Sequence, residues 1–244
     1  MYYYILDLGN KEVVKIKEKM EMTMASYGIS GDFGKISPLS SAFELAKRAQ
    51  DHNYTTIVAI GGSEIINQVI QAVVGTDTVL GIIPINAPKR ICGLIGADNY
   101  KTALDNLRAR KIENFDMGKI AEAKYFLTEA RIKNPRPIKT VLDFGEFKAK
   151  GNFKDIVIGN GTSGNESFRD GFLNIRIDQK ETKSSFLGFF KKSDTPFSSF
   201  RADKLNIDSE EQINILVDEE VAAKTPCEIK LLPFALKLIV AKDS

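Results

Sequence analysis

The chain has 244 residues, of which 43% are hydrophobic and 27% are charged, and its formal net charge is +2 at pH 7. This composition is typical of a soluble globular protein with one large domain or two modest ones. The basic residues are scattered among acids, which excludes the nucleic-acid-binding class, and the single histidine, His52, with the two distant cysteines, Cys92 and Cys227, excludes histidine-based catalysis and a zinc site.

The first half of the chain alternates predicted strands and helices. We expect a strand over 3–8, helices over 11–27 and 40–52, a strand over 56–60, a helix over 65–74, a strand over 79–84 and a helix over 99–109. Ser40 or Ser41 ahead of Glu44 favours a capping box at the start of the second helix. The alternation predicts a Rossmann-like α/β domain with a parallel sheet, which we place over residues 1–118.

The second half of the chain changes to short segments in which apolar and polar residues alternate. The expected strands are 125–132, 140–147, 155–159, 171–178, 212–218, 226–232 and 235–241. Strands of this length and spacing are typical of antiparallel sandwiches. The sequence therefore predicts an antiparallel β-sandwich domain over residues 119–244, with its last strand as the one that could return toward the first domain.

Apolar runs stay well short of the roughly 20 residues that a transmembrane helix requires, so we expect a cytoplasmic protein. The segment Phe186–Lys192 places phenylalanines directly before lysines. These rings either enter a membrane interface, with the lysines at the headgroups, or cover the end of the sandwich core. A lipid or membrane surface and a homo- or hetero-oligomeric partner remain open, whereas nucleic acid is not expected.

The segment Val58–Asn67 has the pattern of a strand, a glycine turn and a helix. An apolar strand ends at Gly61-Gly62, and apolar residues then recur at helical spacing. Such a turn presents unpaired backbone N–H groups and the positive end of a helix dipole, which together favour an anion. The alternative is a purely structural turn, because the Gly-Lys-Ser/Thr of a P-loop and the three spaced glycines of a dinucleotide site are both missing.

Four further landmarks follow this turn. In order along the chain, the five segments are GGSEIIN at 61–67, LGIIPINAPKR at 80–90, IGNG at 158–161, DGFLNI at 170–175, and VDEE at 217–220 with LPFAL at 232–236. Their order resembles the diacylglycerol kinase catalytic family, in particular the bacterial soluble lipid kinases, which are related in fold to NAD kinases. In that family the same places carry GGDGTxN, LGIIPxGTxNDxAR, an NG segment, a DG-L-D-V strand, and DGE with a P-x-x-L strand.

The resemblance implies ATP-dependent phosphorylation of a lipid hydroxyl, with ATP and Mg²⁺ as cofactors. It assigns the base that activates the hydroxyl to Glu220, with Asp218 beside it, and a structural metal to Asp170. The residues that it assigns to nucleotide binding are Asn10, Gly61, Gly62, Ser63, Glu64, Asn67, Lys89 and Arg90.

The departures from the family pattern fall on these working positions. Ser63-Glu64-Ile65 replaces Asp-Gly-Thr, Asn86 to Arg90 replaces Gly-Thr-x-Asn-Asp, and Glu219 replaces the glycine of DGE. A divergent lipid kinase would use Glu64 for magnesium and Lys89 with Arg90 for phosphate. The alternative is a catalytically silent kinase-fold protein with a binding or regulatory role. An NAD kinase is a third reading, for which Asn165-Glu166 is the only match to that family's nucleoside-binding pair.

Overall fold

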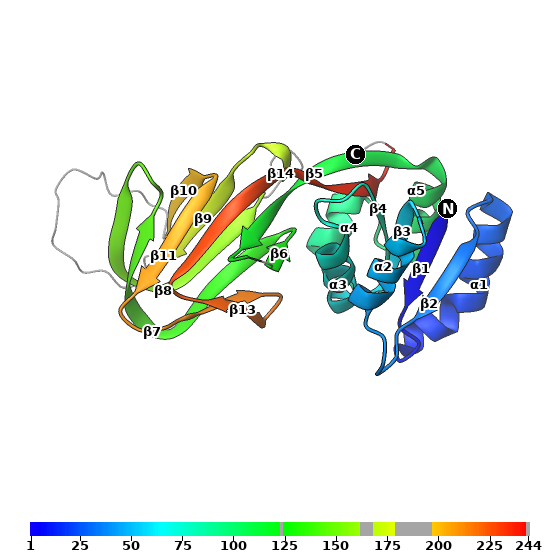
Figure 1. Ribbon diagram of the computed structural model, residues 1–244, viewed down its shortest axis with the longest axis horizontal. Helices are drawn as coiled ribbons and strands as arrows, with labels where there is room; N and C mark the ends of the chain where they lie inside the picture. The colour runs from blue at the N-terminus through cyan, green and yellow to red at the C-terminus, as the bar shows by residue number, and fades with distance from the viewer. Residues whose placement is uncertain (123, 162–167, 179–196, 243–244) are drawn as a thin grey trace. The chain divides into compact units, whose positions relative to one another are not determined.

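The computed structural model describes residues 1–122, 124–161, 168–178 and 197–242, so Asn165-Glu166 and Phe186–Lys192 lie outside the described residues (Figure 1). The chain splits into two compact units. Unit 1 comprises Met1–Phe115 with Phe234–Ser244, and unit 2 comprises Asp116–Pro233. A parallel sheet in the first unit is followed by antiparallel strands in the second, which confirms the predicted fold class.

Unit 1 alternates strands and helices. Its elements are β1 Tyr2–Leu6, α1 Lys11–Tyr27, β2 Gly31–Lys35, α2 Ala42–Asp51, β3 Thr56–Gly61, α3 Ser63–Val73, β4 Val79–Pro84, α4 Lys89–Ile95 and α5 Tyr100–Ala109. The strands are parallel in the order β2-β1-β3-β4, and the end of β14 (Cys227–Val240) pairs in parallel beside β4. The order reverses between β1 and β3, so the carboxyl ends of these two strands form a topological switch point.

Local signals explain where the helices begin. The Ser41 Oγ accepts from the Glu44 N–H at 3.2 Å while the Glu44 carboxylate accepts from the Ser41 N–H at 2.8 Å, which completes the expected capping box. Asn10 caps α1 by accepting from the Glu12 N–H at 3.0 Å. These bonds satisfy N–H groups that the first turn of a helix leaves without a carbonyl partner.

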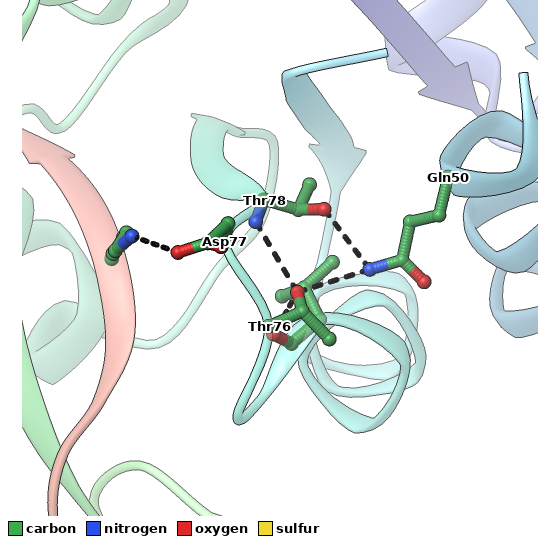
Figure 2. A network of polar contacts seen from close by, with 6 residues as sticks. Gln50, Thr76, Asp77 and Thr78 are labelled. Atoms are coloured by element: carbon green, nitrogen blue, oxygen red, sulfur yellow. Dashed lines mark hydrogen bonds and ion pairs between the residues drawn. The ribbon is translucent and has the colours of Figure 1, made fainter. Parts of the chain in front are cut away.

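A polar network fixes the α3–β4 turn at the amino-terminal edge of the sheet (Figure 2). The Gln50 Nε2 of α2 donates to the Oγ1 atoms of Thr76 and Thr78 at 3.1 and 3.0 Å. On the other side of the turn, the Lys237 Nζ of β14 donates to the Asp77 Oδ1 at 2.6 Å. The short turn between α3 and β4 thereby contacts both helix α2 and the last strand, β14.

Unit 2 is built from antiparallel strands around an apolar core. Two of its strands, β5 Lys111–Ile120 and β14, have part of their length in unit 1. The other strands are β6 Lys124–Phe126, β7 Glu129–Asp143, β8 Lys148–Asn160, β9 Leu173–Asp178, β10 Phe197–Ala202, β11 Lys204–Ser209, β12 Asn214–Val217 and β13 Glu220–Lys224. The order of the main path is β10-β9-β8-β7-β11-β14. Alternate residues of these strands, such as Ile156, Ile158, Ile175 and Ile229, fill the core with no exposed surface.

Several element predictions were wrong in their boundaries. The strands expected at 125–132 and 140–147 belong mainly to the single long strand β7, whose register shifts between Lys133 and Ile138 around two prolines. The strands expected at 226–232 and 235–241 are likewise the one strand β14, which passes through Pro233 and Phe234. Proline interrupts the sequence pattern, but a strand can accommodate it at a bulge or an unpaired position.

Candidate functional site

The predicted nucleotide-binding residues of unit 1 gather at the carboxyl edge of the parallel sheet. Leu6 and Ile60 are register partners near the ends of β1 and β3, so the loop that carries Asn10 starts beside the glycine turn. Helix α1 begins after the first of these loops and α3 after the second. Because both helices start at the topological switch point, their positive ends lie where ligands of open α/β sheets ordinarily bind.

The two glycines of the turn differ in how strongly the backbone requires a glycine. Gly61 has φ of 153°, and a Cβ atom there would lie 2.7 Å from the Ile65 Cδ1. Gly62 has φ of −87°, and an added Cβ would meet the carbonyl oxygens of Ile85 and Asn86 at an ordinary 3.6 Å. Backbone strain and crowding therefore account for Gly61 but not for Gly62, whose Cβ position faces the loop after β4.

The first turn of α3 contains Ser63 and Glu64, and its cap is made by backbone alone. Gly62 is the N-cap residue and supplies no side-chain bond, and the first backbone bond of the helix runs from the Ile66 N–H to the Gly62 carbonyl at 3.2 Å. The N–H groups before Ile66 therefore have no carbonyl within the helix. Glu64 is exposed, and its Oε1 accepts from the Gln68 Nε2 at 3.3 Å. Asn67 lies one turn further along α3 and is half-buried.

The loop after β4 lies against the glycine turn. The Ile85 N–H donates to the Gly61 carbonyl at 3.0 Å, which extends the β3–β4 pairing one residue past the end of β4. Asn86 follows with φ of 58°, and Pro88 is the N-cap of α4. Lys89 and Arg90 are the first residues of this helix. The Lys89 side chain is exposed and that of Arg90 is half-buried.

In unit 2, Asp218 and Glu220 lie on the hairpin between β12 and β13. Val217 pairs with Glu220, and the two residues between them, Asp218 and Glu219, have φ of 49° and 67°. Two consecutive residues with positive φ define a type I′ turn, which favours glycine at the second position. Glu219 therefore occupies the turn position that glycine adopts most readily. All three acidic side chains are exposed.

Asp170 lies in the turn before β9, and both of its carboxylate oxygens have protein partners. Its Oδ1 accepts from the Phe172 N–H at 2.9 Å, and its Oδ2 pairs with a guanidinium nitrogen of Arg201 on β10 at 2.6 Å. The neighbouring Gly171 N–H donates to the buried Asp116 Oδ2 at 2.9 Å. An ion pair with Arg201 thus occupies the carboxylate for which the sequence predicts a metal, and that role for Asp170 stays a prediction.

Sequence reasoning did not single out Gln68, Asp116 or Arg201. A signal existed for Gln68, because it follows Glu64 by four residues on a helix, the spacing at which two side chains meet. Asp116 and Arg201 reach Gly171 and Asp170 across 55 and 31 residues of sequence. Such long-range pairs have no local signal, so the sequence could not have shown them.

A groove of about 440 Å³ on unit 2 contains none of the predicted site residues. Its walls come from β7, β8, β11 and the start of β14, and charged pairs line it. The Lys148 ammonium lowers the pKa of Asp143, to which it is bonded at 2.7 Å, and Lys204 lowers the pKa of Glu228 in the same way. Burial raises the pKa of the Cys227 thiol in its wall. Paired charges of this kind are typical of a sheet face that is exposed to solvent.

Among the residues that the structure describes, no three or more histidine, cysteine, aspartate or glutamate side chains cluster closely enough to hold a metal ion. Within the same residues, no helix is both long and apolar enough to cross a membrane.

The doubly wound unit 1, with its glycine turn at the switch point, followed by an antiparallel unit, defines a two-part α/β class of protein. Residues 7–120 match the model of the diacylglycerol kinase catalytic domain. The predicted resemblance to that kinase family is thereby confirmed, and its match covers the whole carboxyl edge described above.

Solved structures share the fold. A diacylglycerol kinase from Bacillus anthracis str. Sterne superposes with a TM-score of 0.82 at 15% identity, and the match covers 99% of this chain and 97% of that one. An NAD kinase from Archaeoglobus fulgidus in complex with ATP matches with a TM-score of 0.63 at 12% identity, over 100% of this chain and 95% of that one. No curated protein sequence matches the chain. At these identities the structural matches establish the shared fold.

Proposed function

We propose that this protein transfers the terminal phosphate of ATP to the hydroxyl group of a lipid. The observation that carries the proposal is the glycine turn at the end of β3, placed at the switch point of a chain segment that matches a kinase catalytic domain. The N–H groups at the start of α3, which have no side-chain cap, suit a phosphate. The complex of an NAD kinase of similar fold with ATP supports the choice of nucleotide.

The roles of the side chains in each unit are those that the resemblance to the family assigns. Lys89, at the exposed start of α4, would neutralise phosphate charge together with Arg90. Glu220 is the proposed base that takes the proton of the lipid hydroxyl, and Asp218 is the first of the two turn residues before it. Phosphoryl transfer depends mainly on positioning and charge neutralisation. The two cations and the base are therefore the kinds of group that such a transfer needs.

Magnesium fits the chain only as an ion that arrives with the nucleotide. The described residues form no carboxylate cluster, and Asp170 is paired with Arg201. Mg²⁺ is commonly held by one or two carboxylates together with substrate phosphates, and Glu64 is the exposed carboxylate beside the glycine turn. We therefore assign to Glu64 the contact with the metal, which supplies charge neutralisation when it is bound.

The proposal is tested by phosphate transfer from radiolabelled ATP to a panel of lipids with free hydroxyl groups, diacylglycerols among them. We expect labelled lipid with the wild-type chain and none with Glu220→Gln. Glu210→Gln, at an exposed acid between β11 and β12 that pairs with Lys139 at the surface, is the control and should keep full activity. Equal labelling by the wild type and Glu220→Gln would refute catalysis by this residue, and no labelling by either would refute the kinase.

A second candidate function is a catalytically silent kinase-fold protein with a binding or regulatory role. The observation in its favour is the set of residues at the turn: an acid in the first turn of α3, and a proline without an N–H group at the start of α4. Calorimetric titration with MgATP distinguishes the two functions. Binding without transfer supports a nucleotide-dependent regulatory role, and the absence of binding supports a structural one.

A further inference from the structure

The side chain of Gln68 connects Glu64, beside the glycine turn, to helix α2. Its Nε2 donates to the Glu64 Oε1 at 3.3 Å, and its Oε1 accepts from the Ala42 N–H at 2.9 Å. Ala42 is the first residue of α2, and its N–H has no carbonyl partner within that helix. The capping box of α2 serves the Glu44 N–H instead, so Gln68 supplies the bond that the box leaves out.

The direction of the amide is fixed by this arrangement. Only the oxygen of Gln68 can accept from the Ala42 N–H, which leaves the amide nitrogen to face Glu64. The Glu64 carboxylate is thereby held on the side of α3 that faces α2. A carboxylate without this bond could instead turn to the N–H groups of its own first turn, because acids are favourable there.

The position of Glu64 therefore decides whether the first turn of α3 is open to a phosphate. A free carboxylate would cap the N–H groups that Gly62 leaves without a side-chain partner. A held carboxylate keeps them available and stands beside the turn, where a cation bound to phosphate would meet it.

We propose that Gln68 is a positioning residue that holds Glu64 off the first turn of α3 and so keeps the glycine loop open to a magnesium-bound nucleotide. The inference rests on the proposed function for its ligand, and it adds a link between that ligand and α2. Gln68 does not itself contact the nucleotide in this scheme. Its two bonds have separate effects, on nucleotide affinity through Glu64 and on stability through Ala42.

Two substitutions of similar size separate the bonds. In Gln68→Glu the carboxylate can still accept from the Ala42 N–H but repels Glu64, whereas in Gln68→Lys the ammonium still pairs with Glu64 but cannot accept from Ala42. We expect Gln68→Glu to lower the affinity for MgATP about fivefold, and Gln68→Lys to keep it within about twofold. We expect the reverse order in stability, with a fall in melting temperature of about 2–4 °C for Gln68→Lys and less for Gln68→Glu.

The control is the exchanged pair Glu64→Gln with Gln68→Glu, in which an amide can again donate to a carboxylate. Adding Gln68→Glu to Glu64→Gln should cause no further loss of MgATP affinity in calorimetric titrations. A loss that persists in this background would show a plain effect of the added charge and overturn the proposal. So would affinity and melting temperature that fall in the same order across the two variants.

The outcome also separates this inference from the proposed function. Wild-type chain that binds MgATP with the expected order of variants, but transfers no phosphate, keeps the role of Gln68 and rejects the kinase. Transfer activity together with Gln68 variants of wild-type affinity rejects the role of Gln68 alone. Absence of MgATP binding by the wild type rejects both.

Discussion

The Lys237 ammonium donates to the Asp77 carboxylate at 2.6 Å across 160 residues of sequence (Figure 2). Lys237 lies on the part of β14 that pairs with β4, and Asp77 lies in the turn that leads into β4. The Gly75 N–H of the same turn donates to the Ala235 carbonyl at 2.8 Å. The last strand is therefore attached to unit 1 by an ion pair and a backbone bond in addition to its sheet pairing.

This ion pair predicts a pH-dependent effect of Lys237→Gln. The Lys237 hydrogen bond lowers the pKa of Asp77 below its ordinary value of 3.8. A carboxyl group whose pKa is lower in the folded chain stabilises the fold above its unfolded pKa, and the contribution is lost as pH falls through the folded value. We expect Lys237→Gln to lower stability at pH 7 and to converge with the wild type in acid below that ordinary value.

Denaturant unfolding of both chains between pH 7 and pH 2.5 measures the effect. Lys101→Gln, at an exposed position on α5, serves as the control and should follow the wild type throughout. A difference between Lys237→Gln and wild type that stays constant down to the lowest pH would assign the effect to packing of the lysine stem rather than to the ion pair.

The sequence predicts the elements of unit 1 best where periodicity and caps agree. Helix α1 and strand β4 lie over the residues expected for them, 11–27 and 79–84. Strand β2 was missed because its sequence, GDFGK, has two glycines and two charges, and it lies at the edge of the sheet where such residues are tolerated. Helix α4 was missed because it has only seven residues and its N-cap, Pro88, provides no side-chain cap that would indicate a helix start.

The candidate site divides in the same way. Its glycine turn follows from local pattern and topology, so the sequence could place it. The contacts that orient the acids could not be read from sequence, because Arg201 reaches Asp170, and Gln68 reaches Ala42, only after strands and helices have packed. The type of the turn at Asp218-Glu219 could not be predicted either, because it depends on positive φ values that a glutamate does not indicate.

Glu219→Gly should stabilise unit 2. Glu219 has φ of 67° in a two-residue hairpin turn, where a side chain raises the backbone energy and glycine does not. Glycine also costs more conformational entropy on folding, so the net gain should be about 0.5–1 kcal/mol. Lys224→Gly on the neighbouring strand lacks this compensation and should be destabilising. Chemical denaturation of the three chains tests the order, and a loss of stability in Glu219→Gly would contradict the turn type.

Alanine at Gly61 and alanine at Gly62 should change the stability of the fold by different amounts. At Gly61 it meets both the φ of 153° and the Ile65 side chain, so Gly61→Ala should cost more than about 1 kcal/mol of stability. At Gly62 the backbone and the 3.6 Å contacts accept a methyl group, so Gly62→Ala should change stability by less than about 0.5 kcal/mol.

The same Gly62→Ala variant should bind MgATP within about twofold of the wild type, because its methyl group would face the Ile85 and Asn86 carbonyl oxygens and leave the N–H groups of the first turn of α3 accessible. Thermal unfolding and calorimetric titration, carried out on the same preparation, give both quantities. A tenfold loss of affinity in Gly62→Ala would contradict this placement of the methyl group.

Glu64→Gln should change nucleotide affinity in opposite directions with and without magnesium. The exposed carboxylate lies beside the turn, and removing one negative charge near it should strengthen binding of metal-free ATP by about two- to fivefold. If the same carboxylate contacts Mg²⁺, its loss should weaken MgATP binding by a similar factor. The ratio of the affinity for MgATP to the affinity for metal-free ATP therefore falls in Glu64→Gln. Glu18→Gln, an exposed acid in the middle of α1, should leave both affinities unchanged. Stronger binding of both forms by Glu64→Gln would instead mean that the acid only repels phosphate, which is the behaviour expected of a kinase fold whose loop no longer serves transfer.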